Sequence, residues 1–221
     1  MLLHEKSIII AVNGVNTEKN SIWNNGKVEV FAKKIFSQSA DYFHFYNPTT
    51  LGDLKSLEER ASEVASTLNL DYTFFEHNGT VNHPETRVPF CSVKKNQFKI
   101  DGKYYDRVYI LAHSHGVQVA DEILKDLNNK GFPMKNIIVR ALGGSCYISK
   151  ETSGDAKIYQ YMRRYDPVTY KMFKASMRQQ KGSNDSVIFI EDNAYFKPNL
   201  EYHYMTHYMK YIEDLVKNNK S

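Results

Sequence analysis

A serine lies between two histidines in the stretch Val108–Ala120, VYILAHSHGVQVA, where one hydrophobic pattern gives way to another. Residues 108–111 form a continuous apolar run, which is typical of a buried strand. The apolar residues that follow recur at the spacing of one helix face: Val117, Ala120, Ile123, Leu124 and Leu127. Ser114 is therefore predicted to occupy a strand-to-helix turn, with the small residues Ala112 and Gly116 two positions to either side. This pattern is typical of a nucleophile elbow, in which a strained turn lifts a serine hydroxyl above a sheet.

A serine hydroxyl becomes a good nucleophile only when a base removes its proton and an acid orients that base. Asp166 directly follows the predicted strand at 157–165, so we expect its carboxylate at the carboxyl end of that strand. Asp185 and Asp192, which flank the next apolar run, are the alternative acids. A Ser-His-Asp arrangement would then need a histidine later in the chain.

Two histidines, His203 and His207, follow the last predicted strand. An apolar stripe predicts a terminal helix: Met205, Met209, Ile212 and Val216. Both histidines would face solvent if that helix already included residue 203, so we expect it to begin near 207, with Thr206 as its N-cap. His207 is then the predicted base, and His203 is a loop residue that shapes the pocket or is exposed.

The apolar runs that must position these residues alternate with helix-like segments. Strands are expected at 8–12, 42–46, 108–111, 137–142, 157–165 and 187–190, and helices at 28–35, 54–68 and the carboxyl end. This alternation predicts one domain over 1–221 with a mostly parallel, doubly wound α/β sheet and helices on both faces. Residues 71–105 are rich in turn signals, so we expect an irregular or hairpin insertion that covers a pocket or is merely structural.

The serine turn and the order of the acid and the base resemble the α/β-hydrolase superfamily, in particular its lipase- and esterase-like members. The resemblance implies a Ser-Asp-His order along the chain, and Asp166-Pro-Val looks like the acid position of lipase-like hydrolases. The chain departs from the family pattern in having Ala112 where glycine is usual. At 221 residues it also leaves room for little or no cap domain.

The same resemblance implies an oxyanion hole made by two backbone N–H groups. One would come from His115, the residue after the nucleophile. The other would come from Gly14 or Val15, in an Asn13-Gly14-Val15 segment where many lipases carry His-Gly. A plain strand-ending Asn-Gly turn would have the same sequence.

Composition and charge limit the classes of partner. The net charge is +4, from 29 basic and 25 acidic residues, and the chain has no aromatic-interleaved basic stripe, so we expect no nucleic-acid partner. Cys91 and Cys146 are the only cysteines, which favours reduced thiols over a disulfide framework. No apolar run approaches the roughly 20 residues that span a membrane, and the amino terminus lacks a signal-peptide pattern. We therefore expect a cytoplasmic protein, or one exported without a recognisable signal peptide, and the sequence indicates no oligomeric state.

These features predict a serine hydrolase that cleaves a carboxylic ester through an acyl-enzyme, without cofactor or metal. Seven basic residues and one acid between 157 and 181 make a lipid ester and peripheral membrane contact one interpretation. More often such a run is a solvated helix. One alternative is a catalytically silent binding module with this fold. Another is a metal hydrolase using His113, His115, His203 and His207, although no glutamate follows His203 as the zinc-protease motif requires.

Overall fold

The computed structural model describes residues 5–14, 22–23, 25–45, 92–94, 97–100, 103–129, 131–144, 146–163, 166, 169, 186–190 and 203–218. Its main feature is a six-stranded sheet in which every pairing is parallel. The strands are, in spatial order, β2 (Asp41–Phe45), β1 (Ser7–Val12), β6 (Arg107–His113), β7 (Ile137–Leu142), β8 (Lys157–Arg163) and β9 (Ser186–Ile190). The predicted mostly parallel α/β sheet is confirmed.

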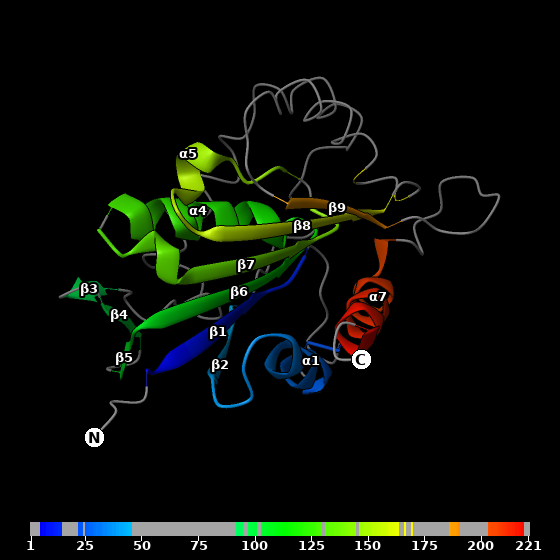
Figure 1. Ribbon diagram of the computed structural model, residues 1–221, viewed down its shortest axis with the longest axis horizontal. Helices are drawn as coiled ribbons and strands as arrows, with labels where there is room; N and C mark the ends of the chain where they lie inside the picture. The colour runs from blue at the N-terminus through cyan, green and yellow to red at the C-terminus, as the bar shows by residue number, and fades with distance from the viewer. Residues whose placement is uncertain are drawn as a thin grey trace.

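Helices cover both faces of this sheet, as the continuous apolar runs of β1 and β6 require. Helices α4 (Gly116–Asn129) and α5 (Lys150–Ser153) lie on one side, and α1 (Lys27–Ile35) and α7 (Met205–Asn218) lie on the other (Figure 1). Two separate apolar clusters result, one between α4 and the sheet and one between the sheet and the α1 and α7 helices. Alternate residues of each central strand contribute to the two clusters, so the strands are buried on both faces.

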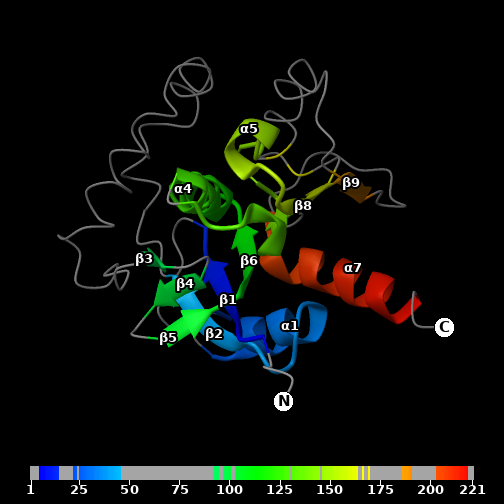
Figure 2. The same cartoon turned by 60° about the vertical axis from the view of Figure 1, so that its left-hand side comes forward.

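A second, antiparallel sheet consists of β3 (Ser92–Lys94), β4 (Gln97–Ile100) and β5 (Lys103–Tyr105). It lies near the amino-terminal ends of β1 and β6 (Figure 2), where the Tyr105 hydroxyl donates to Asp41 Oδ2 over 2.7 Å. A short 3-10 helix, η1 (Met134–Asn136), precedes β7. The small sheet is the described part of the predicted insertion, since residues 71–91 lie outside the described residues. This sheet is therefore at the opposite end of β6 from Ser114.

The terminal helix differs from its prediction in one respect. Helix α7 begins at Met205 instead of near 207, so Thr206 lies inside its first turn and is not its N-cap. The predicted apolar stripe does pack against the sheet, with Met205 and Ile212 buried. The predicted helix at 54–68 lies outside the described residues, and no helix in the described part is long and apolar enough to cross a membrane.

Parallel strands bring their carboxyl ends to the same edge of a sheet. Strands β1, β6 and β8 end at Val12, His113 and Arg163, directly or shortly before the segments from which site residues were predicted. The carboxyl edge of the sheet is thus where the candidate residues can meet.

Candidate active site

Ser114 occupies the strand-to-helix turn that its flanking pattern predicts. Its φ of 56° makes it the one non-glycine residue with positive φ in the described part of the chain. Its backbone N–H donates to the Leu142 carbonyl over 3.0 Å, and its own carbonyl accepts from Val117 N–H over 3.0 Å. A left-handed serine costs of order 1–3 kcal/mol, which the surrounding structure must offset. These backbone contacts hold the serine in the strained conformation of an elbow.

The small residue after the elbow is required by the backbone of β1. A Cβ added at Gly116 would lie 2.6 Å from the carbonyl oxygens of both Val12 and Asn13. Ala112, by contrast, is fully buried within β6, and its side chain is accommodated there. The departure from glycine at 112 is therefore compatible with the turn, whereas position 116 cannot accept a larger residue without a backbone shift.

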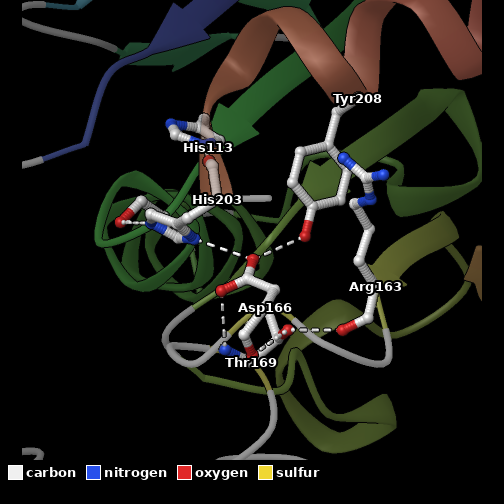
Figure 3. Close-up of polar contacts among 7 residues, drawn as sticks. His113, Arg163, Asp166, Thr169, His203 and Tyr208 are labelled. Carbon is white, nitrogen blue, oxygen red and sulfur yellow. Dashed lines mark hydrogen bonds and ion pairs between the residues drawn. The ribbon is translucent and has the colours of Figure 1, made fainter. Parts of the chain in front are cut away.

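A continuous chain of hydrogen bonds links Ser114 to a buried carboxylate (Figure 3). His203 Nε2 lies 2.8 Å from Ser114 Oγ, and His203 Nδ1 lies 2.8 Å from Asp166 Oδ2. An ionised carboxylate can only accept, so Nδ1 carries the proton and Nε2 accepts from the serine hydroxyl. Asp166 is fully buried and Ser114 is 7% exposed. This arrangement can transfer the serine proton to the imidazole.

The structure does not bring His207, the predicted base, to the serine; His203 lies there instead. His207 lies within the first turn of α7 and is exposed, and its backbone N–H donates to the Tyr204 carbonyl over 3.0 Å. Because the helix begins two residues earlier than expected, His203 lies just before it and turns toward Ser114. The prediction differed because it placed the helix start near 207, so that His207 would stand at the joint between loop and helix.

Asp166 is held by two further residues that sequence reasoning missed. The Tyr208 hydroxyl donates to Asp166 Oδ2 over 2.7 Å, and the Thr169 backbone N–H donates to Oδ1 over 3.3 Å. The Thr169 hydroxyl in turn donates to the Arg163 carbonyl over 3.1 Å and to the Asp166 carbonyl over 3.3 Å. Asp166 therefore sits in a turn closed back onto the end of β8. The alternative acids at 185 and 192 lie outside the described residues.

The first histidine of the HSH triplet holds the backbone of His203. His113 Nε2 lies 2.7 Å from the His203 carbonyl oxygen, which can only accept, so the imidazole donates this bond. Burial lowers the pKa of His113 to about 3, so the ring is neutral. The His113 and His203 rings lie side by side, with centroids 5.0 Å apart. The triplet thus places Ser114 beside His203 and anchors the His203 backbone.

The loop after β1 lies against the elbow. A Cβ added at Gly14 would lie 2.8 Å from Ser114 Cβ and 3.3 Å from Ser114 Oγ. Asn13 Nδ2 donates to the Gly14 carbonyl over 2.8 Å, while Asn13 Oδ1 lies 3.0 Å from His44 Nε2. Burial lowers the pKa of His44 to about 4, and its ring stacks on Trp23 at 5.4 Å. This network fixes the backbone of Gly14 beside the serine.

The other two predicted oxyanion donors are His115 and Val15. His115 is buried and directly precedes helix α4, so its backbone lies at the positive end of the helix dipole. Val15 lies outside the described residues. Within the described ranges no group of three or more His, Cys, Asp or Glu side chains is arranged to hold a metal ion. The metal-hydrolase alternative gains no support there, because His113 and His203 are engaged in the contacts above.

The sheet topology and the serine turn occur together with the chain order Ser114, Asp166, His203. That order, with the serine at a strand-to-helix elbow on a parallel sheet, is the pattern of α/β-hydrolases. The chain has an α/β-hydrolase fold. In this fold the segment after an early strand lies beside the elbow, as the Gly14 backbone does here.

Solved structures similar to this chain are related to it at low sequence identity. No protein-family model matches the chain, and no curated protein matches its sequence. Similar solved structures include alpha/beta hydrolase domain-containing protein 10 from mouse, 11% identical, covering 98% of this chain and 92% of that chain, TM-score 0.43. SOBER1 of Arabidopsis thaliana is 14% identical and covers 98% of this chain and 100% of that one, TM-score 0.44. Est1E from Butyrivibrio proteoclasticus is 7% identical, and the match covers 99% of this chain and 88% of that chain with a TM-score of 0.47. The likeness of this α/β-hydrolase fold to these structures is one of fold alone.

Proposed function

We propose that this chain is a serine hydrolase that cleaves a carboxylic ester through an acyl-enzyme intermediate. The observation that carries the proposal is the unbroken contact from Ser114 Oγ through His203 to the fully buried Asp166. Each of the three groups has a role in this chemistry: Ser114 is the nucleophile, His203 the general base and acid, and Asp166 the group that orients the imidazole and stabilises its charge.

In the acylation step, Ser114 Oγ forms a bond to the ester carbonyl carbon while its proton moves to His203 Nε2. Asp166, already accepting the Nδ1–H over 2.8 Å, stabilises the imidazolium that results. The tetrahedral intermediate then collapses, and the alkoxide leaving group takes the proton from Nε2. Water then attacks the acyl carbon while His203 Nε2 takes its proton. The bond from that carbon to Ser114 Oγ breaks, Oγ takes the proton from Nε2, and the carboxylic acid leaves.

The negative charge on the intermediate requires donors that are already in place. We assign one to the backbone N–H of His115, at the start of α4, and the other to Gly14 or Val15. The position of Gly14 supports this assignment. A Cβ added at Gly14 would lie 3.3 Å from Ser114 Oγ, so the Gly14 backbone lies beside the proposed nucleophile. Backbone donors positioned in this way cost no reorganisation when the charge forms.

The substrate is proposed as a carboxylic ester in general, with a lipid ester as the specific candidate. The basis for the lipid is the excess of basic residues between 157 and 181, most of which lie outside the described residues. Peripheral contact with an anionic surface would follow from the same charges. The proposal takes residues 1–221 as one catalytic domain.

The test is covalent labelling with a fluorophosphonate, followed by intact-mass measurement. The wild type is expected to gain one phosphonyl group and to hydrolyse p-nitrophenyl esters, and Ser114→Ala is expected to do neither while remaining folded. Ser39→Ala, at an exposed serine, is the matched control and should label normally. An acyl chain-length series would then decide whether a lipid ester is preferred. Absence of labelling in folded wild-type protein would instead support the silent binding module.

A further inference from the structure

We propose that Tyr208 is a positioning residue that orients Asp166 toward His203 and sets how strongly that carboxylate holds the imidazole. The inference rests on the proposed function, since it names a fourth member of the same catalytic hydrogen-bond chain.

Two donors share one oxygen of Asp166. The Tyr208 hydroxyl and His203 Nδ1 lie 2.7 Å and 2.8 Å from the same Oδ2, while Thr169 N–H donates to Oδ1 over 3.3 Å. A rotation of the carboxylate would break the contacts to both oxygens, so the three donors together define one orientation. Loss of the phenol would remove one of these donors and leave the imidazole contact on Oδ2 in place.

The phenol keeps its proton at neutral pH. Tyr208 is fully buried, and burial followed by the charge of Asp166 raises its pKa well above the ordinary value. The hydroxyl therefore keeps its proton and shares it with the carboxylate. A neutral donor of this kind withdraws negative charge from the oxygen that faces His203.

The Tyr208 ring packs closely against Gly143. Gly143 follows β7 with a φ of 54°, and a Cβ there would lie 2.9 Å from Tyr208 Oη and 3.0 Å from Cζ and Cε2. The Gly143 N–H donates to the Tyr161 carbonyl over 2.9 Å, which ties this segment to β8. The position of the phenol is thus set by the sheet edge as well as by α7, from which Tyr208 extends toward Asp166 (Figure 3).

The position of Tyr208 has two consequences for catalysis. Without the hydroxyl, Asp166 is less firmly oriented and the imidazole is less well aligned with Ser114, which lowers turnover. The charge on Oδ2 is also less dispersed, so the carboxylate stabilises an imidazolium more strongly. The acidic limb of the pH dependence of kcat/KM should therefore move to higher pH.

The experiment compares Tyr208→Phe with Tyr211→Phe, a tyrosine one turn later on α7. For Tyr208→Phe we expect kcat to fall roughly ten- to hundredfold, as for a misaligned catalytic group, while KM changes less than about twofold. The midpoint of the acidic limb should rise by about half a pH unit. Tyr211→Phe should change neither quantity.

A second variant keeps the hydrogen bond and the ring. Site-specific 3-fluorotyrosine at position 208 gives a more acidic phenol, which is a stronger donor, and should move the acidic limb to lower pH. This opposite shift cannot come from a purely structural role, and it remains measurable if Tyr208→Phe does not fold.

A spectroscopic readout separates this inference from the proposed function. The Nδ1–H proton of His203 is expected as a downfield proton NMR signal that is absent in His203→Ala and displaced in Tyr208→Phe. If wild-type protein hydrolyses no ester, the function fails, but displacement of this signal would still support the role of Tyr208 in holding the carboxylate. An unchanged signal and an unchanged pH profile in Tyr208→Phe would overturn the inference even in an active enzyme.

Discussion

Replacing His203 by alanine removes both contacts that connect the serine to the carboxylate. The Nε2 contact to Ser114 Oγ and the Nδ1 contact to Asp166 Oδ2, each 2.8 Å, are lost together. General-base assistance alone contributes about 10²- to 10⁴-fold, and removal of one member of a triad can cost roughly 10⁶-fold because the members act as a unit. We therefore expect kcat for a p-nitrophenyl ester to fall by about 10³-fold or more.

The same change should also lower stability by a limited amount. Asp166 is fully buried and would keep the Tyr208 hydroxyl and the Thr169 N–H as donors. Loss of the His203 donor is expected to lower the free energy of unfolding by about 1–3 kcal/mol. Urea unfolding followed by circular dichroism measures this, and kinetics at concentrations where the variant is folded separate the two effects.

His207→Ala is the matched control, because the two histidines are four residues apart and only one is buried. An exposed residue without a special contact should change stability by less than about 0.5 kcal/mol and leave kcat within about twofold. Added imidazole should restore part of the activity of His203→Ala, since the truncated side chain leaves space between Ser114 and Asp166. Near-wild-type turnover in folded His203→Ala, together with inactive His207→Ala, would refute the assignment of the base.

Three further changes test other parts of the structure. His113→Phe should lower kcat roughly tenfold, because it releases the His203 backbone. His113→Gln retains a donor and should therefore lose less activity. Equal losses of kcat in both variants would count against this role of His113. Gly116→Ala should lower the free energy of unfolding by about 1–3 kcal/mol or more in urea, because the added Cβ would lie 2.6 Å from two carbonyl oxygens of the β1 end. Burial, and then the charge of Glu122, raises the pKa of Asp121 to about 7. Between about pH 4 and 7 the folded state therefore holds a proton that the unfolded chain has released. The free energy of unfolding falls as the pH rises through this range. Asp121→Asn should therefore be more stable than wild type at pH 8 by about 1–3 kcal/mol, with the difference disappearing near pH 4; a pH-independent difference would contradict the shift.

Local patterns alone placed the strands and the serine. The runs at 8–12, 137–142 and 187–190 correspond to β1, β7 and β9 within one residue, because strands buried on both faces are continuously apolar. Ser114 could be placed at an elbow because the change of period and the small neighbours Ala112 and Gly116 are local features. The position of Asp166 after β8 is likewise readable, since a strand and the turn that ends it are contiguous.

The position of His203 and of the residues that support Asp166 depended on tertiary structure. Two histidines four residues apart follow the same strand, and the choice between them turned on where α7 begins, which apolar periodicity locates only to within one or two residues. Tyr208 lies on the apolar stripe, three residues after Met205 and four before Ile212, so periodicity predicts its burial. Periodicity says nothing of the carboxylate that its hydroxyl meets, because Asp166 is 42 residues away in sequence.

The sequence by itself predicted the fold class and the positions of Ser114 and Asp166 at the ends of their strands, because each depends on a strand and the few residues next to it. Only the tertiary structure decided that His203 faces Ser114, that His113 holds its backbone and that Tyr208 shares Oδ2 of Asp166. The physical reason is that hydrogen-bond partners are selected by distance and direction in space. Ser114 and His113 lie 89 and 90 residues before His203 in sequence and contact it at the carboxyl edge of the sheet. Sequence periodicity does not report contacts over such separations.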